Sequence, residues 1–309
     1  MRVSWALLPL STLIANAFSS PTEGQQQPAR CGTRIADKSF ARTFPKVQAY
    51  EKSIKLRARD DSSQPGSLPP IDVTVYFHTV SSRDKTDVIK DEILEKQFAV
   101  LQETYAVYDV RMHWDRVVAS RTVDDFLATF AWPLTGERVE LKKRFLSSTR
   151  KGGYNALNFY FYTDMPTGEW GSCNLPQDNV TASFDDMTFR EDGCNINYVA
   201  TPGGPNPIVN QGKTAIHEAG HWFGLKHVFH TYQCDDEGDT IDDTPAASTL
   251  TEGCPIGKDS CPDSPGLDPI HNYMDYSDDY CLTEFTPQQK IRMHATWTTL
   301  RSNMTAVPR

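Results

Sequence analysis

Beyond its first residues, the sequence contains no run approaching about 18 consecutive apolar residues, the length that a membrane-spanning helix requires. It also lacks a surplus of positive charge, because 31 Lys and Arg stand against 40 Asp and Glu, for a formal net charge of −9. A protein whose main partner is nucleic acid needs a basic face that neutralises phosphates. We therefore expect a protein that neither spans a membrane nor binds nucleic acid.

Apolar residues are nevertheless plentiful: hydrophobic residues make up 39% of the 309 positions and aromatic residues 11%. This composition is sufficient for a substantial core. The length exceeds one average domain without requiring two large ones.

The N-terminus is typical of a secretory signal peptide. Arg2 supplies a small positive region, Trp5 to Ile14 form an apolar run, and Ala15-Asn16-Ala17 gives an A-x-A cleavage pattern. The alternative is a buried N-terminal helix, which Pro9 and the charge-poor flanks disfavour. We expect residues 1–17 to be removed and the protein to be secreted.

Seven cysteines suit an oxidising compartment, and their odd number leaves one without a partner. Cys31 stands alone near the start, and the other six lie in the body of the chain. Two of them bracket a loop-like insert, and spacing favours two pairs among the last four, although four cysteines allow three connectivities. The expected pairs are Cys173–Cys194, Cys234–Cys261 and Cys254–Cys281. Two N-x-T sequences also predict glycosylation, at Asn179 and Asn303.

Residues 18–68 have the composition of a removable segment. Ser19 to Pro28 is polar and should be disordered. Between Arg30 and Arg59 there are nine Lys and Arg against two Asp and Glu, and residues 60–70 have a linker composition that suits a processing site. We interpret the segment as a basic propeptide, and a basic solvated tail is the alternative. Its charge is opposite to that of the acidic C-terminal region, and this opposition favours docking of the segment on that region.

The next part of the chain alternates between two periodicities. Residues 71–79, 110–118 and 157–162 are predicted strands, and residues 85–107 and, more weakly, 124–148 with a break at Pro133 are predicted helices. This order implies an α/β layer. Residues 169–175 are either an edge strand, which can pair with an extended substrate, or a loop. We place the upper part of a catalytic domain at about 69–224.

The lower part, at about 225–309, has a different composition. From Cys234 to Glu284 there are fourteen Asp and Glu and one Lys, so little regular structure is expected before a helix from Thr286 to about Leu300. The acidic residues between Asp235 and Asp243 can hold calcium through carboxylate oxygens, although they do not form an EF-hand loop. Solvated surface charge is the alternative.

One stretch, from His217 to His227, carries the chemistry. His217 and His221 lie at i and i+4 on a helix and project toward one ion, and Gly224 can end the helix so that His227 returns to the same point. Glu218 can reach a water molecule without binding the metal. The short H-E-x-x-H motif also occurs in ordinary surface helices, but the extended motif and a methionine-containing turn, Asn272 to Tyr276, favour a catalytic zinc site. Ala219-Gly220 should permit close packing, while Trp222 and Phe223 anchor the other side.

Residues 28–32, Pro-Ala-Arg-Cys-Gly, resemble the cysteine-switch motif of metalloprotease propeptides. A thiolate is a good zinc ligand, so Cys31 is a candidate to silence a zymogen by binding the metal. Thr33-Arg34 stand where a proline-aspartate pair follows in the best-known switches. A cysteine that is merely unpaired is the alternative.

Together, the stretches 217–227, 239–245, 253–255 and 272–279 resemble the pappalysin family of metzincins, in its ulilysin-like branch with fungal extracellular metalloproteases. The resemblance implies an α/β (α+β) metzincin-type zincin, with a twisted mixed sheet under long helices and a loop-rich, disulfide-stapled lower subdomain that ends in a helix. It also implies a secreted endopeptidase, calcium sites, the disulfide pattern given above, Met274 beneath the metal and Tyr276 as a stabiliser of the oxyanion.

We expect zinc-assisted hydrolysis of protein or peptide substrates by a monomer, with Glu218 as the general base. The main rival is a secreted zinc or calcium module that binds partners without catalysis. Glu218 disfavours this rival, because a structural metal site needs no general base beside its ligand.

Overall fold

The computed structural model describes residues 30–33, 38–60, 68–130, 136–181, 183, 185–235 and 237–304. Its centre is a sheet in the order β2-β1-β4-β6-β5, with β3 also paired to β1. Neighbouring strands are parallel except for β5, which is antiparallel to β6, so the expected mixed sheet is confirmed. The strands are β1 (Ile71–Ser81), β2 (Val110–His113), β3 (Ser120–Val123), β4 (Ala156–Tyr162), β5 (Gly171–Cys173) and β6 (Cys194–Asn197).

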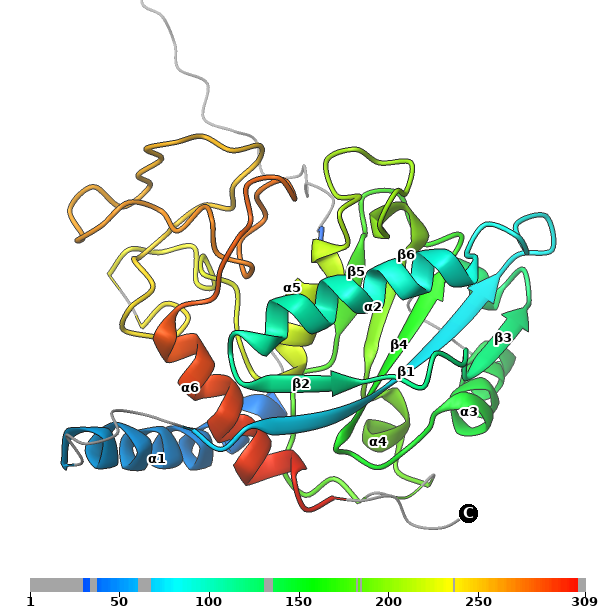
Figure 1. Ribbon diagram of the computed structural model, residues 1–309, viewed down its shortest axis with the longest axis horizontal. Coiled ribbons are helices and arrows are strands. Elements are labelled where there is room, and N and C mark those ends of the chain that lie inside the picture. The colour runs from blue at the N-terminus through cyan, green and yellow to red at the C-terminus, as the bar shows by residue number, and fades with distance from the viewer. Residues whose placement is uncertain are drawn as a thin grey trace, which may run out of the picture.

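Helices cover both faces of this sheet (Figure 1). α2 and α5 pack on one face, and α3 lies on the other. The α-helices are α1 (Lys38–Asp60), α2 (Asp91–Ala106), α3 (Glu137–Thr149), α4 (Met187–Glu191), α5 (Lys213–Trp222) and α6 (Pro287–Thr296). Short helical turns are η1 (Leu127–Thr129), η2 (Tyr198–Ala200) and η3 (Trp297–Arg301), the last with π-helical bonding.

Alternation along the strands divides the core into two layers. Val75 and Phe77 of β1 belong to the cluster that contains Phe98 of α2. Tyr160 of β4 points the other way and packs with Phe145 of α3. This is the period-two pattern that a sheet buried on both faces requires.

The expected strand at 110–118 is wrong in its second half. The chain leaves β2 after His113 and rejoins the sheet at Ser120 as β3. A local turn causes the break, because the Asp115 carboxylate accepts a hydrogen bond from the Val117 N–H at 2.9 Å and Arg116 has φ of 62°. The helix expected from 85 likewise begins only at Asp91.

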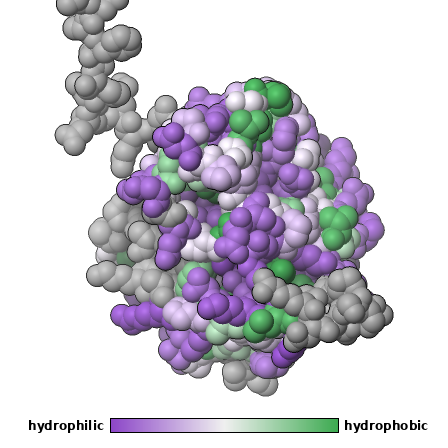
Figure 2. Space-filling model, turned by 90° about the vertical axis from the view of Figure 1, so that its left-hand side faces the viewer, coloured by the Kyte–Doolittle hydropathy of each residue, from purple (hydrophilic) through white to green (hydrophobic). Residues whose placement is uncertain are grey.

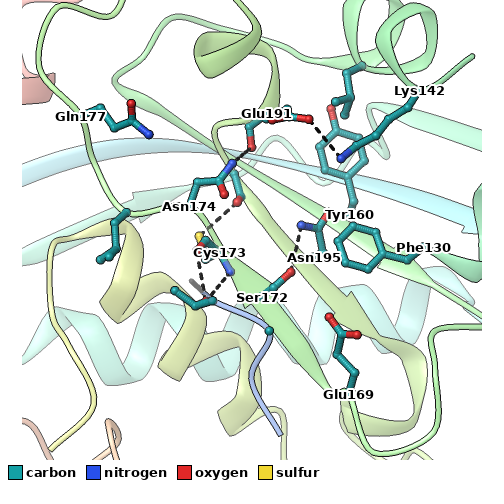
Figure 3. A pocket seen from close by; sticks show the side chains of 15 residues that line it. Phe130, Lys142, Tyr160, Glu169, Ser172, Cys173, Asn174, Gln177, Glu191 and Asn195 are labelled. Atoms are coloured by element: carbon teal, nitrogen blue, oxygen red, sulfur yellow. Dashed lines mark hydrogen bonds and ion pairs between the residues drawn. The ribbon is translucent and has the colours of Figure 1, made fainter. Parts of the chain in front are cut away.

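The edge strand β5 is the part of the sheet that borders the candidate site. It resolves the choice between strand and loop at 169–175 in favour of a short strand. A cavity of about 440 Å³ opens beside it, between the end of the sheet and α3 (Figure 3). The disulfide Cys173–Cys194 joins β5 to β6.

Between α5 and α6, the described residues form no helix or strand. Two disulfides staple these loops, Cys234–Cys261 and Cys254–Cys281. α6 then begins with a capping box in which the Thr286 hydroxyl accepts from the Gln289 N–H, as the sequence predicts. The face of the molecule toward the loop-rich side is largely hydrophilic (Figure 2). None of the described helices combines the length and the apolar character needed to cross a membrane.

The basic N-terminal segment contains a long helix, which its composition did not predict. Residues 38–60 form α1, which packs along α6 at the lower edge of the molecule (Figure 1). Val47 and Ile54 are buried there with Leu300. The Lys55 ammonium lies 3.1 Å from the Asp242 carboxylate. The docking expected from opposite charges is thus present, but it is carried by a helix with an apolar stripe.

Candidate active site

The first turn of α5 is fixed to the loop that follows Met274. The Asp279 carboxylate accepts hydrogen bonds from the backbone N–H groups of Gln211 (2.8 Å) and Lys213 (3.4 Å). The Lys213 ammonium donates to the backbone carbonyls of Asp279 (2.6 Å) and Leu282 (2.8 Å). Because helix N-termini leave such N–H groups without intrahelical partners, the carboxylate both caps the helix and complements its dipole.

The end of α5 is the tight turn that the sequence predicts. Gly224 has φ of 87°, a left-handed conformation that favours glycine, and the Leu225 N–H donates to the Gly220 carbonyl at 2.9 Å. A side chain at Gly224 would also meet the Thr296 hydroxyl, 2.5 Å from an ideal Cβ. The turn therefore reverses the chain and brings His227 back to the helix.

A buried network of charged residues contacts the C-terminal end of α5, and no sequence motif predicted it. Asp192 accepts hydrogen bonds from Arg301 (2.9 Å), Arg150 (3.3 Å) and the Trp222 indole (3.2 Å). Arg301 also donates to the Trp222 carbonyl at 3.1 Å. All four residues are at most 2% exposed, so the charges of the two arginines and the aspartate face one another inside the protein.

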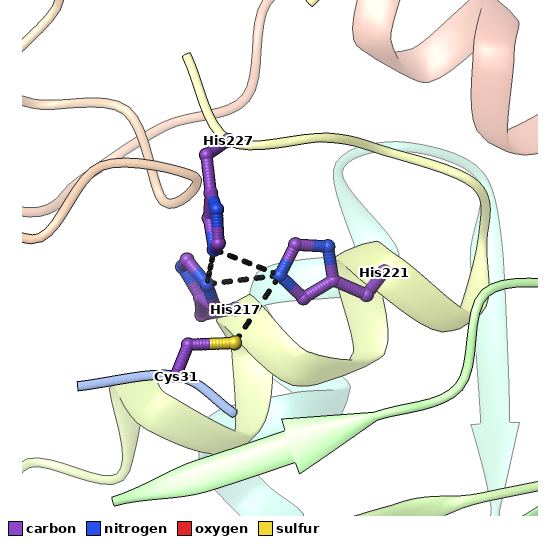
Figure 4. Close-up of side chains that lie close together, drawn as sticks. All are labelled: Cys31, His217, His221 and His227. Carbon is purple, nitrogen blue, oxygen red and sulfur yellow. Dashed lines mark hydrogen bonds between the residues drawn. The ribbon is translucent and has the colours of Figure 1, made fainter. Parts of the chain in front are cut away.

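The three histidines converge as expected (Figure 4). The Nε2 atoms of His217 and His221 lie 3.1 Å apart, those of His221 and His227 lie 3.1 Å apart, and those of His217 and His227 lie 3.2 Å apart. All three side chains are buried. Three nitrogen atoms that face one point at these separations could hold a metal ion.

The tautomers of two histidines follow from their backbone partners. The Nδ1 atom of His217 lies 2.7 Å from the Tyr273 carbonyl, and that of His221 lies 2.8 Å from the Leu225 carbonyl. Since a carbonyl only accepts, each Nδ1 carries the proton and each Nε2 keeps a lone pair. Burial lowers the pKa of His217 to about 4, and it lowers the pKa of His221 and His227 well below the usual value. The imidazoles are therefore neutral, as metal ligands must be.

The donor set fits a metal ion of zinc's preferences. Zinc binds imidazole nitrogen at about 2.0–2.1 Å, so tetrahedral ligands lie about 3.3–3.4 Å apart, within a few tenths of an ångström of the separations here. Within the described residues, one atom each from Cys31, His217, His221 and His227 can also be chosen so that all four lie within 4.8 Å of one another. Nitrogen and sulfur donors suit zinc rather than calcium.

Glu218 lies beside this cluster, fully buried. Its Oε2 accepts from the Thr33 hydroxyl at 3.1 Å and lies 3.5 Å from the Cys31 sulfur, while its Oε1 has no hydrogen-bond partner among the described residues. Gly171 makes room for it, because an ideal Cβ there would lie 2.7 Å from Oε1. Burial raises the pKa of Glu218 to about 8, and a cation bound by the histidines would favour the charged carboxylate.

Met274 lies directly under α5. An ideal Cβ at Gly220 would lie 2.5 Å from the Met274 sulfur, so only glycine leaves room for the methionine here. This is the close packing that the small residues Ala219 and Gly220 predict. The turn is held by the Asn272 side chain, which accepts from the Met274 N–H at 2.9 Å. Trp222 and Phe223, as expected, are fully buried on the other side.

Residues 30–33, hereafter the strap, cross the mouth of this site. They run parallel to β5, with the Gly32 N–H donating to the Gly171 carbonyl at 2.8 Å and the Trp170 N–H donating to the Arg30 carbonyl at 2.9 Å. The Cys31 sulfur points at the histidines, 3.5 Å from Nε2 of His221. Burial, followed by the charge of Glu218, raises the pKa of the Cys31 thiol, which a bound cation would counteract.

Both ends of Tyr276 contact the strap. Its hydroxyl accepts from the Cys31 N–H at 3.2 Å and lies 3.3 Å from the Cys31 carbonyl oxygen, to which it can donate. Its backbone carbonyl accepts from Arg30. The Arg30 guanidinium also stacks on Trp170, 4.5 Å from the ring centroid, and lies 3.6 Å from the Asp278 carboxylate.

In the acidic stretch that is a candidate for calcium binding, two carboxylates make hydrogen bonds with protein groups. The buried Asp239 carboxylate accepts from the Ile241 N–H at 2.9 Å and from the Thr244 hydroxyl at 2.8 Å. Asp243 accepts from the Thr286 hydroxyl at 2.6 Å at the start of α6. Asp236 lies outside the described residues. The sequon residues Asn179 and Asn303 are both exposed, as glycosylation requires.

Several known proteins are similar to this chain. A family model described as pregnancy-associated plasma protein-A, of peptidase family M43, matches residues 155–298. Extracellular metalloprotease 1 of Coccidioides posadasii is 38% identical over 307 residues, covering 98% of this chain and 99% of that protein. An extracellular metalloprotease of Colletotrichum graminicola is 42% identical over 303 residues, covering 96% and 98%.

Among solved structures, mature mirolysin of Tannerella forsythia in complex with a cleaved peptide resembles this fold. The TM-score is 0.56 at 23% identity, and the match covers 74% of this chain and 91% of the mirolysin chain. The likeness confirms the metzincin-type fold expected from the sequence. Two extracellular metalloproteases are 38% and 42% identical to this chain over nearly their whole length. The chain therefore belongs to the pappalysin (M43) family of metalloendopeptidases.

Proposed function

We propose that the chain is a secreted zinc endopeptidase that is made as a zymogen. The observation that carries the proposal is the triangle of imidazole nitrogens, 3.1–3.2 Å on each side, with the Glu218 carboxylate beside it. His217, His221 and His227 would hold the zinc. When bound, the ion supplies Lewis acidity, which polarises a peptide carbonyl and makes a water molecule more nucleophilic.

Glu218 is the proposed general base. Its unpartnered Oε1 is available to accept the proton of the attacking water, and the same carboxyl group can then deliver that proton to the leaving amine. The Tyr276 hydroxyl is the proposed stabiliser of the oxyanion, since it already lies within 3.3 Å of a peptide carbonyl oxygen at the site. Met274 supplies an apolar floor under the metal ligands.

The strap is the proposed inhibitory element. It pairs with β5, the edge that an extended substrate would use, and it directs Cys31 to the histidine cluster. A thiolate there would take the ligand position that hydrolysis needs. We assign residues 18–68 to the propeptide, with α1 docked on α6, and residues 69–309 to the catalytic domain.

The same proposal covers the remaining expectations. Secretion rests on the signal sequence at 1–17, outside the described residues, and on the extracellular relatives. Glycosylation at Asn179 and Asn303, a calcium ion among the acidic loops and a monomeric state stay predictions. Peptide substrates are supported by the cleaved peptide bound to mirolysin.

The test is the processed protein with Glu218→Ala. The variant should retain zinc at one ion per chain and lose casein cleavage, because the ligands remain and the base is gone. Full cleavage by a zinc-loaded variant would exclude Glu218 as the base. A folded, zinc-loaded and propeptide-free wild-type protein that cleaves nothing would favour the non-catalytic binding module.

A further inference from the structure

The three histidines that converge on one point are not held in the same way. The Nδ1 atoms of His217 and His221 are each fixed by a backbone carbonyl, at 2.7 and 2.8 Å. Among the described residues, the only close polar contacts of the His227 ring are those of its Nε2 with the other two imidazoles. A histidine that binds a metal needs an outer partner that fixes the orientation of its ring. His227 therefore needs a partner of another kind.

Phe229 is that partner, because its ring lies flat against the imidazole of His227. The ring centroids are 5.0 Å apart, and the angle between the ring planes is 9°. Aromatic rings at this separation attract each other beyond the effect of the area that they bury. Phe229 is only 1% exposed, so other side chains enclose its ring. The stacking fixes the plane of the imidazole, and the backbone of the loop sets the direction of Nε2 within that plane.

The same phenylalanine ring contacts Tyr276. Their centroids are 4.9 Å apart with an interplanar angle of 75°, and the ring of Tyr276 meets that of His227 at 5.0 Å and 75°. Each of the three rings thus contacts the other two. The Tyr276 hydroxyl lies at the reacting centre, as its contacts with the backbone of Cys31 show. A displacement of Phe229 would therefore reach a metal ligand and the proposed oxyanion stabiliser together.

The loop that carries Phe229 is held in place by backbone contacts. The Val228 N–H donates to the Met274 carbonyl at 3.3 Å, which joins the loop to the turn under α5. The Tyr232 N–H donates to the Phe229 carbonyl at 3.0 Å, and Tyr232 has φ of 55°. Such a conformation is uncommon outside glycine and persists where the surrounding contacts enforce it. The rings of Tyr232 and Phe229 lie 5.4 Å apart, and Tyr232 is 57% exposed, so it covers Phe229 from the solvent side.

We propose that Phe229 is a positioning residue, which holds the imidazole of His227 in the plane that directs Nε2 to the metal position and keeps the ring of Tyr276 beside it. The inference deepens the proposed function and rests on it, since it takes the histidines as zinc ligands and Tyr276 as the oxyanion stabiliser. Phe229 contributes no ligand atom of its own. If its ring only filled the core, its loss would lower stability and leave the metal site unchanged.

The test compares zinc binding by the processed protein and its Phe229→Leu variant, in competition with a chromophoric chelator. Leucine keeps the position apolar and removes the ring, so the zinc affinity should fall by about ten- to hundredfold, as for the loss of other outer partners of metal ligands. At saturating zinc, kcat on a fluorogenic peptide should fall at least about tenfold with KM little changed, because Tyr276 acts on the transition state.

Two further variants separate the ring from the volume that it fills. Phe229→Tyr keeps the ring and should bind zinc nearly as tightly as wild type. Phe229→Met is a second variant without a ring and gives the same comparison if the leucine variant does not fold. With cobalt in place of zinc, the visible absorption bands of the ion should shift in the leucine and methionine variants and stay in place in the tyrosine variant.

Phe161→Leu is the matched control, since Phe161 is buried in the same core cluster and its ring contacts are with Phe77 and Phe159. It should lower stability and leave the zinc affinity and the cobalt spectrum unchanged. Wild-type zinc affinity in the folded variants without the ring, or an equal loss in Phe161→Leu or Phe229→Tyr, would overturn the inference. A folded wild-type protein that binds no zinc would instead contradict the proposed function.

Discussion

The sulfur of Cys31 lies 3.5 Å from Nε2 of His221, although 190 positions separate the two residues in the sequence. The contact depends on the pairing of the strap with β5 and on the turn at Gly224, which completes the histidine cluster. A thiol placed there can act as a ligand or can simply fill the site, and the two roles predict different behaviour of the full-length chain.

Cys31→Ala should release activity without proteolytic processing. An intramolecular ligand acts at about millimolar effective concentration, so its loss should raise casein cleavage by the full-length chain by about a hundredfold or more. Ser53→Ala, in the same N-terminal segment but on α1, is the control, and the full-length chain that carries it should remain as inactive as wild type. If the full-length Cys31→Ala chain stays as inactive as wild type, pairing with β5, rather than the thiol, blocks the site.

Sequence spacing predicted the local part of the site, because a helix and a glycine turn fix the positions of His217, His221 and His227 by themselves. It could not predict the groups that surround them. Gly171, which makes room for Glu218, and Asp279, which caps α5, come from distant segments and carry no periodic signal. Their roles depend on tertiary packing.

The sequence contains a signal for helix α1, namely the spacing of its apolar residues, although the basic charge of the segment is more conspicuous. Val47 and Ile54, spaced by seven residues, fall on the same face of a helix, and both are buried against α6. Their seven-residue spacing indicates a helix, whereas the composition of the segment indicates only a basic propeptide or, alternatively, a solvated tail. Opposite charges predict that the segment docks on the C-terminal region, but they do not predict its secondary structure.

Asp192→Asn should destabilise the fold strongly. The substitution leaves Arg150 and Arg301 buried with no carboxylate between them, and breaking a buried pair costs about 3–5 kcal/mol. Chemical denaturation should show this loss in the free energy of unfolding. Asp87→Asn, at an exposed position, should stay within about 0.5 kcal/mol of wild type. Equal stabilities of the two variants would contradict the structural role of the network.

Gly220→Ala should disturb Met274, whose sulfur lies 2.5 Å from the position of the new Cβ. Overpacking of this kind costs about 1–3 kcal/mol. Because the two residues touch, Met274→Ala in the same chain should recover part of the loss, and a double-mutant cycle in unfolding free energy measures the coupling. Strictly additive effects would show that the two positions do not press on each other.

The raised pKa of the buried Asp239 carboxyl should make the stability of the protein depend on pH. Burial raises its pKa to about 7, against about 3.9 in an unfolded chain. Between these values the folded protein keeps the proton and the unfolded chain loses it, so the contribution is complete below about pH 4 and is lost as the pH rises through about 7. Relative to wild type, Asp239→Asn should remove a decline of a few kcal/mol over this range, as measured by urea unfolding at several pH values.

The same variant separates two readings of the acidic loop. If Asp239 binds calcium, Asp239→Asn will instead lower stability at neutral pH, and added calcium will stabilise only the wild-type protein. A calcium-independent gain in the variant supports the hydrogen-bonded arrangement with Ile241 and Thr244.

The most direct test of the central claim is cleavage of a denatured protein by the processed chain before chelation, after zinc chelation, and after zinc is restored. The account predicts that cleavage disappears with the metal and returns with zinc in proportion to its occupancy, up to one ion per chain. Cleavage that persists in a chain shown to be metal-free would contradict it, because the three histidines would then have no part in the reaction.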